Sequence, residues 1–222
     1  MGGSSVWDGT LSLEGFNASA TALIKQWEEM EVDESLPDWT WRPCCRMGVP
    51  SEVEGYLALE GVYRNCGESQ IEDRNDFDDA DIAADDSWFF SLQVQSSSDV
   101  AHVYDFHAVY SHSYRVPVLY FQGHHGSGQL LTLDEIKQDI PSNSFKVLNE
   151  SKWTFITREE HPHLSRPWFT LHPCGTSEWM KLLLQETEVV DKEKTLKYLP
   201  AWLSVVGQAV GLKIPLELHC SS

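Results

Sequence analysis

The first periodic stretch of the chain has the spacing of an amphipathic α-helix. Its apolar residues follow one another at steps of three and four: Phe16, Ala20, Leu23 and Trp27. Residues spaced in this way lie on one face of a helix, and that face packs against a core. We therefore expect a helix from Leu13 to Met30.

Short segments in the middle of the chain alternate apolar and polar residues, which is typical of β-strands. The expected strands are residues 38–42, 52–63, 100–110, 113–121 and 153–157. The short polar link 111–113 predicts an antiparallel hairpin. Gly55 or Gly61 is expected to mark a bulge. Pro117 favours an edge or a bulge, because proline cannot donate to a sheet ladder.

The run Tyr114–Phe121 has two interpretations. A strand at the edge of a sheet could add to the sheet of a partner. A strand with apolar residues on both faces is usually part of the core. Since this run is apolar on both faces, we favour the core.

Helical periodicity returns toward the C-terminus. The pattern predicts a short helix over 131–140, a helix over 177–187 and an almost wholly apolar helix over 195–210, which Gly211 ends. The last helix is too short to cross a bilayer and suits a buried position in the core. Between these elements the proline-rich segment 161–167 is expected to cross the surface as an ordered loop.

These elements predict one α+β domain over residues 1–222, with an antiparallel sheet meander and helices grouped against it. Residues 67–98 form an acidic and serine-rich insertion. We interpret it as a solvated surface insertion. The alternative is a short docking motif centred on Trp88.

The charge of the chain excludes several partners. Its formal net charge is −18, and positions 68–86 hold nine acidic residues against one arginine. Nucleic acids and anionic membranes need clustered cations, so neither is an expected partner. No secretory signal is visible, and the five cysteines have no regular spacing. We therefore expect reduced thiols, a cytoplasmic location and no stable membrane insertion.

Cys174 has the most informative surroundings. The apolar run 168–171 ends before Pro173, and Gly175, Thr176 and Ser177 then lead into a helical pattern. Because Pro173 has no N–H to donate, the chain must leave the strand there. We expect Cys174 on a turn, with Thr176 or Ser177 capping the next helix.

Three uses of Cys174 compete. It could be a buried structural thiol, or it could join His161, His163 and His172 in a zinc site, although that spacing matches no common zinc motif. The third use is nucleophilic catalysis, with His172 close enough in sequence to assist. No signature of a cysteine protease surrounds it.

The sequence also resembles a known family. The resemblance rests on Tyr110-Ser111-x-Ser113-Tyr114-x-Val116-Pro117-Val118-Leu119-Tyr120-Phe121, Glu160-His161-Pro162, Leu171-His172-Pro173-Cys174, Trp202-Leu203-Ser204-Val205-Val206-Gly207, Val210-Gly211-Leu212 and Pro215-Leu216. In these motifs the chain is similar to the autophagy-related protein ten family, which consists of E2-like conjugating enzymes. The similarity is strong from about residue 100 to 217 and weaker at Trp39-x-Trp41-Arg42-Pro43.

The resemblance implies an E2-like (UBC-type) fold and a function. Cys174 would receive the ubiquitin-like autophagy-related protein twelve as a thioester from the E1-like autophagy-related protein seven. It would pass this modifier to a lysine of autophagy-related protein five, for autophagosome formation. No cofactor and no metal are implied, and the rival hypothesis is a noncatalytic adaptor that binds through its sheet and acidic loop.

The chain departs from the wider ubiquitin E2 pattern in one respect. Those enzymes carry His-Pro-Asn, whereas here Pro162 precedes His163 and Pro173 precedes Cys174 itself. Another group must therefore support the oxyanion. His172 is the candidate by proximity, with a structural role as the alternative; Tyr56 and Asn149 have no support beyond their residue type.

Overall fold

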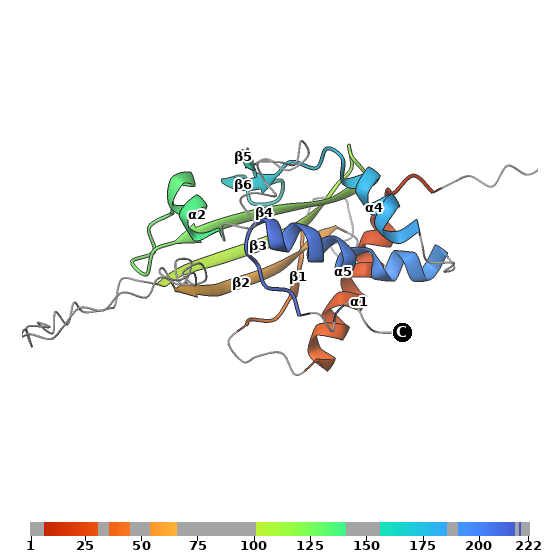
Figure 1. The fold of residues 1–222 in the computed structure, drawn as a ribbon, viewed down its shortest axis with the longest axis horizontal. Coiled ribbons are helices and arrows are strands. Elements are labelled where there is room, and N and C mark those ends of the chain that lie inside the picture. Colours follow the sequence, from red (N-terminus) through yellow and green to blue (C-terminus); the bar gives the residue numbers. More distant parts are fainter. Residues whose placement is uncertain are drawn as a thin grey trace, which may run out of the picture.

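The computed structural model describes residues 7–30, 36–44, 54–65, 101–140, 156–185, 191–215 and 218. Its elements, in chain order, are α1 (Leu13–Glu29), β1 (Thr40–Pro43), β2 (Gly55–Asn65), β3 (Ala101–Ser111), β4 (Val116–His124), α2 (Leu133–Asp139), β5 (Ile156–Glu160), β6 (Pro167–Leu171), α4 (Thr176–Gln185) and α5 (Asp191–Ala209). Figure 1 shows the sheet with α1, α4 and α5 gathered toward one end. The expected α+β architecture is confirmed. The insertion at 67–98, with Trp88, lies outside the described residues, as does Asn149.

The strands form one antiparallel sheet in the order β1-β2-β3-β4-β6-β5. The expected hairpin is β3–β4, closed by the pair Ser111–Val116. The expected bulge is confirmed at Gly61, where φ is 81° and the register shifts between Leu59 and Val62. Segment 161–167 was expected to cross the surface, and this was wrong: the chain turns back there, and β5 and β6 pair as a hairpin.

Pro117 occupies an interior strand, so the prediction of an edge or bulge was wrong. It pairs with Tyr110 of β3, but β6 pairs with β4 only at Tyr120 and Phe121. A proline is tolerated in a strand where its nitrogen needs no acceptor. This condition holds at Pro117 because β6 forms no pair with β4 at that position.

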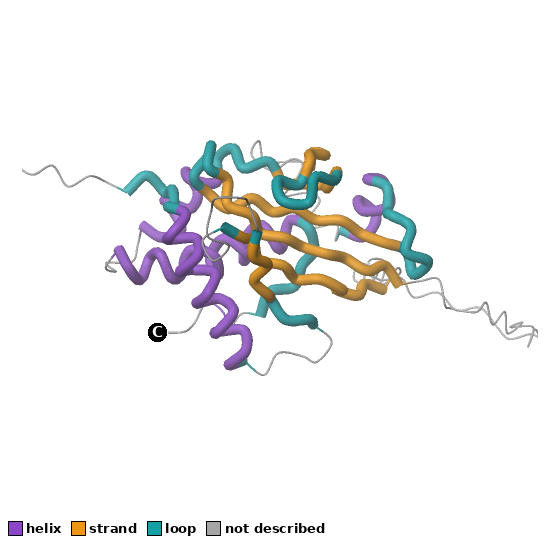
Figure 2. Tube along the Cα trace, turned by 180° about the vertical axis from the view of Figure 1, so that it is seen from behind, coloured by secondary structure: helices purple, strands orange, loops and turns teal. Residues whose placement is uncertain are grey.

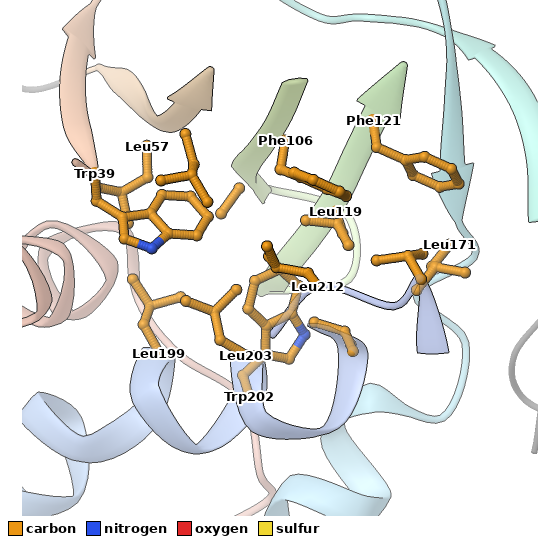
Figure 3. Close-up of a cluster of buried hydrophobic side chains, with 14 of the residues drawn as sticks. Trp39, Leu57, Phe106, Leu119, Phe121, Leu171, Leu199, Trp202, Leu203 and Leu212 are labelled. Atoms are coloured by element: carbon orange, nitrogen blue, oxygen red, sulfur yellow. The ribbon is translucent and has the colours of Figure 1, made fainter. Parts of the chain in front are cut away.

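The two faces of the sheet carry different cores because side chains alternate along each strand. Leu57 and Leu59 of β2 point to the larger core, which α1 and α5 cover, whereas Tyr56 and Ala58 belong to a smaller cluster on the other face. Figure 2 shows both helices against the sheet, and Figure 3 shows Leu199, Trp202 and Leu203 of α5 directed toward the strands. Residues 116–121 are all buried, so the core interpretation of this run is confirmed.

Helix α5 contains Pro200 in its interior, and α1 compensates for it. Proline has no N–H to give the carbonyl of Leu196, one turn earlier. The fully buried Ser19 of α1 takes its place: its hydroxyl donates to Leu196 O at 3.1 Å and accepts the Leu199 N–H at 2.9 Å. One side chain therefore satisfies two backbone groups of the interrupted helix and also joins α1 to α5.

The helix ends follow the sequence with two exceptions. The structure confirms α1, α2 and the glycine end of α5, where Gly211 has φ 68° and Leu212 N–H bonds to Gly207 O at 2.7 Å. Helix α5 begins four residues earlier than expected. Helix α4 begins at Thr176, so Thr176 and Ser177 lie within its first turn and do not cap it. Among the described residues, no helix is long and apolar enough to span a membrane.

Candidate active site

Cys174 lies on the turn between β6 and α4, as expected, and its side chain is partly exposed. Pro173 ends the strand, and its carbonyl accepts the Thr176 N–H at 3.1 Å. Gly175 has φ 84°, a left-handed conformation that a side chain would strain. This sharp turn holds the thiol at the surface, so the interpretation of a buried structural thiol is wrong.

His172 lies beside Cys174 through the backbone. Its Nδ1 accepts the Cys174 N–H at 3.2 Å. A ring nitrogen that accepts carries no proton, so the ring proton of the neutral form is on Nε2. The ring of Tyr114, in the β3–β4 turn, meets the imidazole edge-on at 5.8 Å between centroids. The imidazole is thereby held by the Cys174 backbone and by the Tyr114 ring.

A small cavity of about 50 Å³ opens next to this turn. Its walls come from four parts of the chain. Strand β4 contributes Pro117 and Leu119, the segment before the cysteine contributes His172 and Pro173, α4 contributes Trp179 and α5 contributes Val205. The cavity exists because β4 and β6 pair at only two positions and then separate. Thr176, which is 5% exposed, completes the wall below the cysteine.

The segment before α1 fastens the site to the sheet. Leu11 N–H donates to Arg115 O at 2.8 Å, and the Tyr110 hydroxyl donates to Leu11 O at 2.8 Å. Gly9 passes so close to α4 that an added Cβ would lie 1.8 Å from Ser177 O. Residues far apart in the sequence therefore fix both the β3–β4 turn and the start of α4.

His161 and His163 lie in a different place, against Tyr56, with ring centroids at 5.1 and 5.5 Å. His172 and Cys174 do not join them. Within the described part of the chain, no group of three His, Cys, Asp or Glu residues could hold a metal ion. The zinc interpretation is wrong because the β5–β6 turn directs its histidines into the smaller cluster.

The two buried histidines of this cluster form a directed chain of hydrogen bonds. His161 Nδ1 accepts the backbone N–H of His163 at 3.2 Å, and its Nε2 lies 3.1 Å from His107 Nδ1. His107 Nε2 in turn lies 3.3 Å from Glu60 Oε1. Burial lowers the pKa of His107 to about 4 and that of His161 to about 3, so both rings are neutral. Their role is to hold the β5–β6 turn against the sheet.

Of the other oxyanion candidates, Asn149 lies outside the described residues, and Tyr56 does not lie near Cys174. Tyr56 belongs to the histidine cluster on the far face of the sheet. The residue that sequence reasoning missed is Tyr114, because its contact with His172 joins positions from separate strands. Its only sequence signal was its place in the Tyr-Ser-x-Ser-Tyr motif.

Comparisons with known proteins place the chain in a family. A family model described as "Autophagocytosis associated protein, active-site domain" matches residues 15–217. An Arabidopsis thaliana protein named ubiquitin-like-conjugating enzyme ATG10 is 44% identical over 219 residues, 96% of each chain. Its Homo sapiens namesake is 32% identical over 190 residues, 81% of each chain. A crystal structure of the autophagic E2 Atg10 aligns with a TM-score of 0.46 at 12% identity, covering 92% of this chain and 99% of that one.

Relatives at this identity and coverage define the class: the protein is an E2-like conjugating enzyme of a ubiquitin-like system. The chain belongs to the family described as autophagocytosis associated protein, active-site domain. Both the resemblance seen in the motifs and the expected E2-like α+β fold are confirmed.

Proposed function

We propose that Cys174 carries a ubiquitin-like modifier as a thioester. The observation that carries this proposal is a partly exposed thiol on a tight turn that Gly175 permits, beside a small cavity, in a chain matched by a family model named for its active site. Following the resemblance, the donor is the E1-like autophagy-related protein seven. The modifier is autophagy-related protein twelve, and the acceptor is a lysine of autophagy-related protein five.

Two acyl transfers make up the reaction. The Cys174 thiolate attacks the C-terminal carbonyl of the modifier, which arrives as a thioester of the activating enzyme. A new C–S bond forms, and the thiolate of that enzyme leaves. A lysine amine then attacks the Cys174 thioester, gives up a proton and releases the Cys174 thiolate with an isopeptide bond. A covalent carrier divides one difficult transfer into two easier ones.

We assign His172 the supporting role. Its Nδ1 accepts the Cys174 N–H at 3.2 Å, which holds the imidazole next to the residue that would carry the thioester. A donor held in place before reaction stabilises an oxyanion without reorganising. The support is geometric, and removal of one such donor costs roughly 100- to 1,000-fold in rate. We place the reaction in the cytoplasm, since the described cysteines Cys44 and Cys174 are both free.

The test combines the protein with autophagy-related proteins seven and twelve and ATP. The wild type should form an adduct that reductant removes, and Cys174→Ser should form an ester that resists reductant. Cys44→Ser is the matched control, because Cys44 is also a free, partly exposed thiol, and it should behave as wild type. If the wild type forms no adduct, the thioester proposal fails and the noncatalytic adaptor takes its place.

His172 is tested in the second half-reaction. His172→Ala should still accept the modifier but discharge it to the acceptor lysine more slowly. His112→Ala, an exposed histidine of the β3–β4 turn, is the control. Equal discharge by His172→Ala and wild type would assign His172 a structural role only.

A further inference from the structure

Strand β6 leads to Cys174, and only two backbone pairs join it to β4. These pairs are Tyr120–Thr170 and Phe121–Phe169. In the same register the next pair would join Leu119 to Leu171, but the ladder between β4 and β6 ends before it. Both leucines are buried. The chain therefore leaves the sheet for the site at a point where backbone pairing alone does not hold β6 to β4.

The side chain of Thr170 joins the two strands at this point. Its hydroxyl donates to Leu119 O at 2.9 Å, and the hydroxyl oxygen also lies 3.4 Å from Leu171 O. These two carbonyls belong to the residues that the next backbone pair would join. Thr170 is fully buried, so water does not compete for this hydrogen bond, and its loss would not be repaid by solvent.

Three residues separate Thr170 from Cys174, and they connect this hydrogen bond to the site. Leu119 and Leu171 line the cavity together with His172. His172 Nδ1 accepts the Cys174 N–H at 3.2 Å. A shift of the end of β6 away from β4 therefore moves the imidazole and, with it, the backbone of Cys174.

We infer that Thr170 is a positioning residue for Cys174: its hydroxyl fixes where β6 leaves β4, and so where the turn 172–175 lies beside the cavity. Thr170 acts through the backbone of residues 171–173. The inference rests on the thioester proposed above. Reacting groups misplaced by about 1 Å can slow a reaction roughly 100-fold, so a hydrogen bond at the base of the turn affects the rate.

Amide hydrogen exchange of the full-length protein, followed by NMR, tests this positioning without a partner. Thr170→Val removes the hydroxyl and keeps the shape of the side chain. Two N–H groups report on the turn, because the Cys174 N–H bonds to His172 Nδ1 and the Thr176 N–H bonds to Pro173 O. Both should exchange about tenfold faster in this variant, since the turn opens locally more often. A tenfold change equals roughly 1.4 kcal/mol.

Three further variants separate the hydroxyl from other effects of substitution. Thr170→Ser keeps the hydroxyl and should retain the slow exchange of the wild type. Thr157→Val is the matched control, because Thr157 pairs with Thr170 across β5 and β6 but its hydroxyl donates to the exposed Glu159 carboxylate at 3.0 Å. This control should exchange as the wild type does. Thr170→Ala removes the hydroxyl without placing a methyl group against Leu119 O, and it replaces the valine variant if that variant does not fold.

The rate of discharge tests the consequence. Autophagy-related protein twelve is joined to Cys174 as a thioester, and autophagy-related protein five is the acceptor. Thr170→Val should discharge about tenfold more slowly at saturating acceptor, whereas the acceptor concentration that gives half the maximal rate should not change. Thr170→Ser and Thr157→Val should keep the wild-type maximal rate. The rates are measured at a temperature at which far-UV circular dichroism shows each variant folded, so a loss of stability alone does not lower them.

Each other outcome overturns a defined statement. If the turn amides of Thr170→Val exchange as in the wild type, the inference is wrong, whether or not the thioester forms. If they exchange faster but discharge at saturating acceptor is unchanged, Thr170 stabilises the turn only, and the inference is again wrong. Failure of Thr170→Ser to restore both rates would show that the hydroxyl is not the cause. If the wild type forms no adduct, the thioester proposal fails, and faster exchange would then assign the Thr170 hydroxyl a structural role.

Discussion

Replacing Ser19 with alanine should destabilise the protein far more than a serine-to-alanine change usually does. The side chain is fully buried and makes two hydrogen bonds to α5, one to Leu196 O and one from the Leu199 N–H. The bond to Leu196 O is partly buried, so leaving this carbonyl without a donor costs up to about 1–3 kcal/mol, and the loss of an ordinary hydrogen bond costs about 1 kcal/mol. We expect Ser19→Ala to lower the free energy of unfolding by about 2–4 kcal/mol.

Urea and thermal unfolding, followed by tryptophan fluorescence and circular dichroism, measure this loss. For a chain of this size the Tm should fall by roughly 5–12 °C. Thr21→Ala is the control on the same helix, because Thr21 also donates to a backbone carbonyl, that of Asn17, but is exposed. It should change stability by no more than about 0.5 kcal/mol.

A double-mutant cycle with Pro200→Ala tests the physical cause. Alanine restores an N–H at position 200, which can bond to Leu196 O in the ordinary helical manner. In that background Ser19→Ala should cost about 1–3 kcal/mol less than in the wild type. Additive effects of the two substitutions would refute the reasoning, since they would show that Ser19 does not replace the bond missing at Pro200.

Three further predictions concern pH, the turn and the insertion. Burial lowers the pKa of His107 to about 4 and of His161 to about 3, against 6.5 in the unfolded chain. As pH falls from 6.5 toward 4 the unfolded state takes up more protons, so stability should fall by about 1.4 kcal/mol per pH unit for each histidine. His107→Gln should reduce this slope in urea titrations at several pH values, whereas the exposed His112→Gln should keep it. Gly175→Ala places a side chain at φ 84° beside Cys174. This substitution should lower the free energy of unfolding by about 1 kcal/mol and slow adduct formation. Gly128→Ala, at φ 83° with open space around it, should lose similar stability and form the adduct normally. Deleting residues 68–86 should change the urea midpoint little, because Asn65 and Ala101 already pair across the hairpin that a shorter link would close; a large loss would show that the segment is integral to the fold.

Local features of the sequence predicted the turn that carries Cys174. Cys174 is held by a proline that ends a strand and a glycine in a left-handed turn, and both are properties of single residues. Helix α1 was predicted to within one residue of its end, because its apolar face repeats without interruption. Helix α5 begins earlier than predicted because its first turn carries the charged residues Lys192, Glu193 and Lys194. Charged residues do not extend the repeat of apolar positions from which the helix was predicted.

Features that depend on distant contacts could not be predicted. The sequence shows His161 between a charged residue and a proline, yet it is fully buried. Its ring bonds to His107 of β3, and His107 in turn bonds to Glu60 of β2. The interior position of Pro117 depends on where β6 stops pairing with β4. The contact of Tyr114 with His172 follows from the same topology.

Pro117 helps to keep the cavity beside Cys174 open. Strands β4 and β6 separate at the cavity. Neighbouring strands tend to extend their pairing, because each new inter-strand hydrogen bond satisfies a backbone group. Pro117 has no backbone N–H, so it cannot donate such a hydrogen bond from β4. Continued pairing of β6 would draw His172 and Pro173 into the sheet and move Cys174 away from the cavity. A bond that the chain cannot make therefore keeps the Cys174 thiol at the surface.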